Sequence, residues 1–246
     1  MVKENKLFYD NNPFQYGYFS KEEIIANMNL ELKNYIQKLE NSLICDIGCG
    51  CGRNLLYASK YAERCIGVDI SNKSLEFAKQ FINSNNIDFI EGDNLSIPID
   101  DNLADLVISD GVVHHTGDTV RAFNECIRIL KSNGLLYLAV YKKFRYYPFL
   151  YNYIGGIFRL MHKNRLGEFF IENLFVYLFF LFYKTFKFSK LRFFEIRNIF
   201  FDYFLTPIAT FHSRSEVKKW ILEKDCILEK YEKTNGNCHV FFIRKL

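Results

Sequence analysis

Short apolar runs alternate with amphipathic stretches between residues 42 and 141. The runs at 43–47, 65–69, 87–90, 106–108 and 135–141 predict strands, and the stretches at 52–61, 71–83 and 119–130 predict helices. Because the strands are apolar throughout and are separated by helices, they are typical of a parallel sheet covered on both faces. This part of the chain is therefore predicted to have an α/β fold.

The flanking regions extend this pattern. They predict helices over 21–39 and 216–223 and strands over 227–231 and 238–243. Ser213 or Ser215 is a candidate N-cap for the second of these helices. The turn residues Asn235-Gly236-Asn237 lie between the last two strands and predict an antiparallel hairpin.

Residues 142–205 differ from the rest of the chain in composition. They hold 23 of the 43 aromatic residues, and their 11 Lys and Arg against 4 Asp and Glu give a net charge of +7. The whole chain carries +4, so the remainder carries about −3 (4 minus 7). We expect a single domain over 1–246 with a helical, aromatic-rich insertion over 142–205 that follows the fifth strand.

The overall composition restricts the class of protein. A chain of 246 residues with 49% apolar and 24% charged residues is typical of one globular domain, not of a disordered or fibrous protein. A net charge of +4 is too small to predict nucleic-acid binding. The seven cysteines lack disulfide-like spacing and the first residues are polar, so we expect free thiols, no signal peptide and a cytoplasmic location.

The first candidate site is the sequence Asp46-Ile47-Gly48-Cys49-Gly50-Cys51-Gly52, between the first strand and the next helix. Glycines let the backbone approach a ligand closely, and the N–H groups of a helix N-terminus attract a carboxylate or phosphate. The spacing differs from the GxGxxG of dinucleotide enzymes and from a phosphate loop. The acidic residue before the first glycine suits a ligand with a cationic amine.

Two more acidic residues follow neighbouring strands. Asp69 ends the second strand, where a carboxylate can accept both hydroxyls of a ribose. Asp93 follows the third strand and can meet an adenine amino group. Open α/β folds bind ligands at the carboxyl edge of the sheet, so these side chains are predicted to share one site.

As an ordered set, these motifs resemble the class I S-adenosylmethionine-dependent methyltransferases, nearest to the type 11 branch that includes the quinone-biosynthesis methyltransferases. The resemblance covers residues 40–141 and the closing helix and hairpin from 212, and rests on 46–52, Asp69, 93–94, 105–115 and 130–138. It implies a Rossmann-like sheet of seven mostly parallel strands with an antiparallel C-terminal hairpin. It also implies S-adenosylmethionine as the cofactor and S-adenosylhomocysteine as its product.

The resemblance assigns residues to the methionine part of this cofactor. Asp46 and the backbone of Gly48, Cys49 and Gly50 would hold it. Ser109, at the end of the fourth strand, would lie beside it.

Other residues are assigned to the nucleoside part. Asp69 would bind the ribose, and Ile70 would pack on the adenine. Asp93 and Asn94 would contact the adenine.

His114 and His115 follow the fourth strand, and the resemblance places them on the substrate side. One of them is a candidate general base, because an ordinary histidine pKa near 6.5 suits proton abstraction. In the alternative, one packs against a helix and the other only shapes the pocket. Neighbouring residues on a helix point about 100° apart, so both are not expected to serve one proton.

The cysteines near the glycine loop do not predict a metal site. Cys45, Cys49 and Cys51 have a C-x3-C-x-C spacing that fits no common zinc site. We expect no metal, and we expect the other four cysteines to be core thiols.

Three roles are open for the insertion: a cap over the pocket, a membrane-surface patch, or a nucleic-acid surface. The apolar run 174–183 is shorter than the ~20 residues that cross a bilayer. Its flanking cations suit an interfacial helix on anionic lipid; they are Lys184, Lys187, Lys190, Arg192 and Arg197. Aromatic residues beside cations can also stack on bases, but these are dense and rich in Phe.

The favoured function is methyl transfer from S-adenosylmethionine to a small, hydrophobic or lipid- or glycan-linked acceptor, with peripheral contact at the inner membrane surface through 142–205. One alternative is a tRNA methyltransferase of the wobble-uridine type, whose members carry His-His after the fourth strand. Another is a non-catalytic S-adenosylmethionine-binding accessory protein. Nucleic acid is a less favoured partner because the basic charge is moderate.

Overall fold

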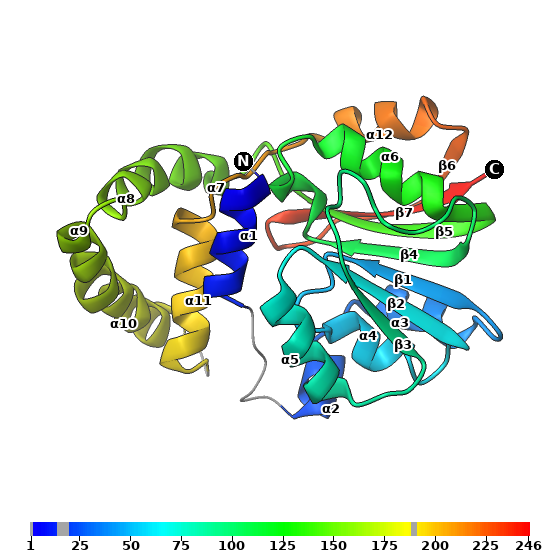
Figure 1. Cartoon of the computed structure of the whole chain (residues 1–246). Helices are drawn as coiled ribbons and strands as arrows, with labels where there is room; N and C mark the ends of the chain where they lie inside the picture. Colours follow the sequence, from blue (N-terminus) through cyan, green and yellow to red (C-terminus); the bar gives the residue numbers. More distant parts are fainter. Residues whose placement is uncertain (1, 14–19, 188–190) are drawn as a thin grey trace. The chain divides into compact units, whose positions relative to one another are not determined.

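The computed structural model describes residues 2–13, 20–187 and 191–246. These residues form two compact units. The first unit consists of Met1–Lys143 and Thr210–Leu246, and the second consists of Phe144–Ala209. Figure 1 shows a sheet with helices in the first unit and helices alone in the second.

One sheet of seven strands organises the first unit, in the order β3-β2-β1-β4-β5-β7-β6. The strands are β1 (Leu43–Ile47), β2 (Arg64–Asp69), β3 (Ile87–Glu91), β4 (Ala104–Asp110), β5 (Leu130–Tyr141), β6 (Cys226–Glu232) and β7 (Cys238–Lys245). Strands β1 to β5 are parallel, and β7 pairs antiparallel with both β5 and β6. The predicted Rossmann-like sheet with its antiparallel C-terminal hairpin is confirmed.

Helices cover both faces of the sheet (Figure 1). One face packs against α2 (Lys21–Ala26), α3 (Leu30–Gln37), α4 (Arg53–Ala58) and α5 (Asn72–Ile82), and the other packs against α6 (Thr119–Ile129) and α12 (Arg214–Leu222). Side chains alternate between the two cores along each strand, so Ile44 lies with α3 and Cys45 lies with α6.

The N-terminal region differs from the prediction of one helix over 21–39. The structure has two helices there, because Asn27 ends α2 and the Asn29 side chain accepts from the Leu32 N–H at the start of α3. A further helix, α1 (Val2–Asn11), precedes them.

The structure fixes two further boundaries. Of the two candidate N-caps, Ser213 caps α12 through a capping box with Glu216, so the helix begins at Arg214 and not at Glu216. Strand β5 begins at Leu130, five residues earlier than expected, because Leu130 pairs with Ala104 before the register shifts.

The second unit is helical. Its helices are α7 (Tyr146–Phe149), α8 (Gly155–Met161), α9 (Arg165–Phe170), α10 (Val176–Phe186) and α11 (Phe193–Phe204), with π-helical turns at Leu150–Ile154 and Ile171–Phe175. The rings of Phe158, Phe179, Phe200 and Phe204 contact one another with centroids 4.9 to 5.9 Å apart and form its core.

Helices α9 and α10 join through a π-turn into one helical stretch. It runs over Arg165–Phe186, and within the described residues it alone is long and apolar enough to cross a membrane, by length and composition. The apolar run 174–183 is therefore part of a helix of 22 residues. Lys190, one of the cations named for a membrane patch, lies outside the described residues.

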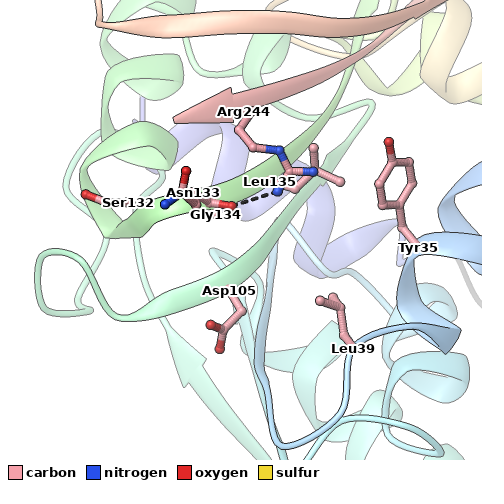
Figure 2. A pocket seen from close by; sticks show the side chains of 8 residues that line it. All are labelled: Tyr35, Leu39, Asp105, Ser132, Asn133, Gly134, Leu135 and Arg244. Atoms are coloured by element: carbon pink, nitrogen blue, oxygen red, sulfur yellow. Dashed lines mark hydrogen bonds between the residues drawn. The ribbon is translucent and has the colours of Figure 1, made fainter. Parts of the chain in front are cut away.

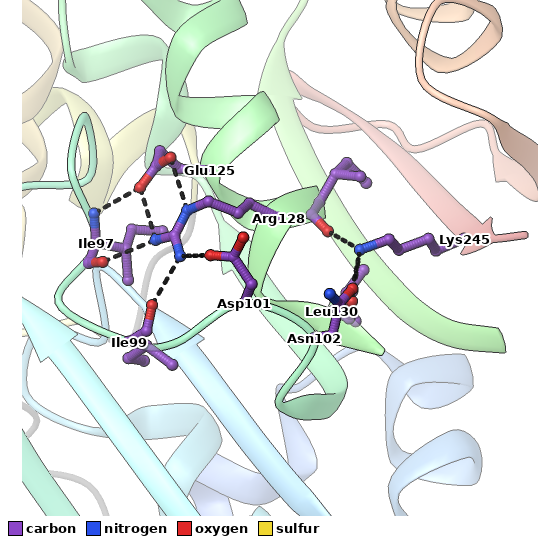
Figure 3. Close-up of polar contacts among 9 residues, drawn as sticks. Ile97, Ile99, Asp101, Asn102, Glu125, Arg128, Leu130 and Lys245 are labelled. Carbon is purple, nitrogen blue, oxygen red and sulfur yellow. Dashed lines mark hydrogen bonds and ion pairs between the residues drawn. The ribbon is translucent and has the colours of Figure 1, made fainter. Parts of the chain in front are cut away.

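A charged cluster fixes the loop between β3 and β4 to α6 (Figure 3). The Arg128 guanidinium donates to the carbonyl oxygens of Ile97 and Ile99 and to the carboxylates of Glu125 and Asp101, over 2.6 to 2.9 Å. The same loop carries the residues predicted to contact adenine, so α6 sets their position.

Candidate active site

The glycine loop turns sharply between β1 and α4. Gly48 has φ +73°, and an added Cβ there would lie 2.2 Å from Val112 Cγ1. Gly50 has φ +53°, and apart from its chain neighbours no heavy atom of the described residues lies within 4 Å of where its Cβ would be. Glycine is required at Gly48 by packing, whereas at Gly50 it leaves space that a ligand can fill.

The N–H groups of this loop already have partners. Those of Gly48 and Cys49 donate to the Val68 carbonyl over 2.7 and 3.0 Å, and that of Gly50 donates to Asp69 Oδ2 over 2.8 Å. These three N–H groups precede α4, so the expected role of the helix N-terminus and the contact of Gly48, Cys49 and Gly50 with the methionine part stay predictions. Gly48, Cys49 and Gly50 shape the site through the path of the backbone.

Asp46 is a buried carboxyl group at the carboxyl end of β1, 1% exposed. Its Oδ1 accepts from Asn54 Nδ2 over 3.4 Å, and within the described residues its Oδ2 has no hydrogen-bond partner. Burial, and then the charge of Asp110, raise the pKa of Asp46 to about 7. A buried carboxyl oxygen without a partner suits a cationic amine, and this fits the predicted role at the methionine part of the cofactor.

Asp69 is buried at the carboxyl end of β2, the next strand of the sheet. Its two oxygens accept from the N–H groups of Gly50 and Ser71, each over 2.8 Å. Burial raises its pKa, although these two N–H groups act in the opposite direction. Each carboxylate oxygen keeps one more acceptor position, so the group can still take two ribose hydroxyls.

The residues predicted to contact adenine lie beside Asp69. Ile70 is partly exposed at the tip of β2 and belongs to neither core. Asp93 accepts from the Leu95 N–H over 2.9 Å and shapes the turn after β3. The buried Asn94 Oδ1 has no hydrogen-bond partner in the described part of the chain. Their contacts with adenine stay predictions.

The end of β4 contributes Ser109 and Asp110. The Ser109 side chain is fully buried beside Cys126 of α6, so its place next to the methionine part stays a prediction. Asp110 lies on the other face of the sheet and forms an ion pair with Arg53, the residue after the glycine loop. Sequence reasoning missed this pair.

His114 and His115 lie on a short 3₁₀-helix, η1 (Val113–His115), after β4. Both ring nitrogens of His114 are buried without hydrogen-bond partners among the described residues, and burial holds its pKa well below the usual value. Its ring centroid lies 3.7 Å from that of Tyr141. His114 is therefore neutral and enclosed, and a general-base role for either histidine stays a prediction.

Helix α1 closes the same edge of the sheet, which sequence reasoning also missed. The Asn5 side-chain amide donates to the His115 carbonyl over 2.6 Å, and Asp10 Oδ1 accepts from the Ser71 hydroxyl over 2.8 Å. Lys6 forms an ion pair with Glu91 at the end of β3. Helix α1 therefore contacts η1 after β4, Ser71 after β2 and the end of β3, and each of these places adjoins candidate site residues.

A separate pocket of about 230 Å³ lies at the opposite edge of the sheet (Figure 2). Asp105 near the amino end of β4 and Ser132 in the amino-terminal part of β5 line it, and the Arg244 guanidinium, also in the lining, donates to the Asn133 carbonyl over 2.7 Å. Because open α/β folds bind ligands at the carboxyl edge, this pocket is not the candidate site.

The cysteines do not form a metal site in the described residues, where no group of three or more His, Cys, Asp or Glu side chains is placed to hold an ion. All seven cysteines are free thiols, as expected. Burial raises the pKa of Cys45 and Cys51 to about 12, so both are protonated at neutral pH.

Comparison with known proteins agrees with this geometry. Residues 45–138 match the family model described as "Methyltransferase domain". The chain is 30% identical over 122 residues to "Uncharacterized methyltransferase YcgJ" of Bacillus subtilis, covering 47% of this chain and 48% of that protein. It is 29% identical over 154 residues to the phosphoethanolamine N-methyltransferase of Plasmodium falciparum, covering 57% and 58%.

A third relative is "Probable tRNA methyltransferase 9B" of Bos taurus, 32% identical over 114 residues, covering 45% of this chain and 24% of that protein. The chain thus spans about half or less of the length of these relatives.

Solved structures share the fold over most of the chain. A SAM-dependent methyltransferase of Methanosarcina mazei matches with a TM-score of 0.56 and 17% identity, covering 89% of this chain and 98% of that one. One from Aquifex aeolicus matches with a TM-score of 0.53 and 13% identity, covering 93% and 100%. Residues 45–138, with the glycine loop, Asp46 and Asp69 at one edge of such a sheet, therefore form a methyltransferase domain of the class I S-adenosylmethionine-dependent type, whose cofactor is S-adenosylmethionine.

Proposed function

We propose that this chain transfers a methyl group from S-adenosylmethionine to a small hydrophobic acceptor, free or linked to a lipid or glycan. The observation that carries the transferase assignment is the buried Asp46 oxygen that has no partner among the described residues, in the same loop region as the open space beside Gly50. These two features fit the amino-acid part of the cofactor, and the free acceptor positions of Asp69 support a role at its ribose.

When bound, S-adenosylmethionine supplies an electrophilic methyl group, so the chain's own residues mainly align an in-line attack and exclude water. Asp46 would orient the amine and Asp69 the ribose. Helix α1, held to His115 and Ser71 by Asn5 and Asp10, would shield this edge from solvent. A base is needed only for an acceptor that keeps its proton, and His115 is the candidate because His114 is fully enclosed.

The composition of the second unit supports an apolar acceptor. The chain leaves the first unit after the carboxyl end of β5 and returns at Thr210, whose N–H donates to the His114 carbonyl over 2.9 Å. The segment between these points is rich in Phe, Tyr and Leu, which suits an apolar acceptor. A relative named for a small acceptor, phosphoethanolamine, supports a small molecule. We also propose that the segment 142–205 caps the pocket and that the protein acts at the cytoplasmic face of a membrane.

Methylation of tRNA is the second candidate function. It is supported by the relative named for tRNA methylation and by the His-His pair after β4. A non-catalytic cofactor-binding protein is the third reading, because intact Asp46 and Asp69 support binding without requiring turnover.

The test is a methyl-transfer screen with methyl-labelled S-adenosylmethionine and a host extract divided into lipid, RNA, protein and small polar fractions. We expect label in the lipid or small-molecule fraction with the natural chain and less label with Asp69→Ala when the cofactor is below saturation. Label in RNA would select tRNA methylation. No label in any fraction, with cofactor binding retained in calorimetry, would select the non-catalytic reading.

A further inference from the structure

The outer side of Arg165–Phe186 carries an exposed apolar stripe. From Leu166 to Phe186, exposed residues recur at spacings of three and four, and nine of the twelve are Leu, Phe or Tyr. Leu178 is 50% exposed and Phe182 is 44% exposed. Surface helices normally present polar residues on this side, and a large exposed apolar patch marks an interaction site.

The inner side of the same stretch is also apolar, and it is already packed. Ile171 and Val176 are buried, and Phe180 contacts Phe193 of α11 with ring centroids 5.4 Å apart. Residues on both sides of this helix are therefore apolar, but only one side has a protein partner in the described chain. A helix that is apolar all round is typical of burial in a core or contact with lipid.

The charges around the stripe select the partner. Residues 155–187 contain five Lys and Arg and two Glu, for a net charge of +3. Lys163 and Arg165 precede the stripe, and Lys187 follows it, all exposed. Cations at both ends of an apolar stripe complement the negative surface of an anionic bilayer.

The packing of α11 decides how the helix meets the bilayer. Glu172, within the stretch, forms an ion pair with Arg197 of α11. A helix that crossed the bilayer would carry this ion pair and α11 into the hydrocarbon, which is costly for charged groups. A helix that lies in the plane of the interface keeps its inner side on α11 and inserts only the stripe.

We propose that the exposed stripe of Arg165–Phe186 docks the protein on an anionic lipid bilayer, with the helix in the plane of the interface. This deepens the membrane part of the proposed function and rests on it, but docking needs neither cofactor nor turnover, so it can be measured separately from methyl transfer.

The experiment is vesicle flotation of the full chain at low salt, without cofactor. We expect most of the protein to float with phosphatidylcholine vesicles containing about 30 mol% phosphatidylglycerol, and little with phosphatidylcholine alone or at high salt. The double variant Leu178→Glu with Phe182→Glu should lose about tenfold or more in binding. The matched control Leu222→Glu changes a residue of α12 that is 80% exposed in the first unit, and it should float like the natural chain.

Circular dichroism and S-adenosylhomocysteine binding establish that each variant folds. If the double variant does not fold, Lys163→Glu with Lys187→Glu replaces it and should weaken binding to anionic vesicles only. Failure of the natural chain to float would overturn the proposal, as would flotation that survives alkaline carbonate, which indicates a spanning helix. A dimer in sedimentation that Leu178→Glu converts to a monomer, without vesicle binding, would instead assign the stripe to a second copy of this chain.

Discussion

The Asn54 side-chain amide donates to only one oxygen of the Asp46 carboxyl group, across 3.4 Å, and the other oxygen is buried without a protein partner in the described chain. Asn54 belongs to α4 and Asp46 to β1, so the contact depends on the glycine loop between them. Because the buried carboxyl group has so few hydrogen bonds to offset its loss of water, burial dominates its pKa and raises it to about 7.

We predict that binding of S-adenosylhomocysteine strengthens as the pH rises from 6 to 8. A pKa of about 7 leaves Asp46 mostly protonated at pH 6 and mostly ionised at pH 8, and only the ionised form pairs with the ligand's ammonium group. The ionised fraction rises about tenfold over this range. Calorimetry across this pH range measures the effect.

Asp46→Asn should flatten this pH dependence and weaken binding at pH 8. Methylthioadenosine lacks the amino-acid part and is the matched control ligand, whose affinity should not follow Asp46. A steep pH dependence that survives in Asp46→Asn would refute the assignment.

Because the pKa is raised in the folded state, ionisation of Asp46 also lowers the free energy of unfolding as the pH rises from about 4 to 7.

Asp69→Ala should weaken cofactor binding by about 1–3 kcal/mol, the scale for losing hydrogen bonds to a charged group. The Gly50 N–H also loses its acceptor in this variant. Asp88→Ala, an exposed carboxylate of β3 in an ion pair with Arg64, is the control and should bind normally. Equal affinity of Asp69→Ala and the natural chain would exclude the ribose role.

Two glycines of one loop should respond differently to alanine. Gly48→Ala forces a Cβ against Val112 at 2.2 Å and should lower the free energy of unfolding by about 2 kcal/mol or more. Apart from its chain neighbours, the Cβ of Gly50→Ala meets no atom of the described residues, so the change should cost only about 1 kcal/mol in backbone strain while weakening cofactor binding. Thermal unfolding and calorimetry on both variants separate the effects, and unchanged affinity in Gly50→Ala would place the cofactor elsewhere.

Arg128→Ala should lower the free energy of unfolding by about 2–3 kcal/mol, since it leaves several carbonyl and carboxylate acceptors without their donor. Cofactor affinity should fall as well, because the loop that carries Asn94 loses its attachment to α6. Arg121→Ala, an exposed position of the same helix, is the control for thermal melts. Equal melting temperatures of the two variants would show that the cluster does not hold the loop.

The sheet and the strand-tip residues could be predicted because they depend on local pattern. Apolar runs fix the strands, and Asp46 and Asp69 directly follow such runs, so their shared edge follows from parallel topology. The glycine loop carries its own signal, because glycines with φ +73° and +53° are where the chain must turn.

The contacts that complete the site could not be predicted in the same way. Asn5 and His115 are 110 residues apart, and no periodicity relates them. The break between α2 and α3 depends on whether the Asn29 side chain caps a helix or lies within one, a choice the apolar spacing does not decide. The early start of β5 is a tertiary effect of pairing with β4.

The points where the chain leaves and re-enters the methyltransferase unit are joined, since the Lys143 N–H donates to the His212 carbonyl over 3.0 Å. A segment whose two ends already touch can be shortened, lengthened or exchanged without pulling the rest of the fold apart. The unit that carries the donor-binding residues is therefore separable from the smaller unit that we propose selects the acceptor. A change of acceptor then requires replacement of one contiguous stretch of sequence, while the residues that hold the methyl donor stay unchanged.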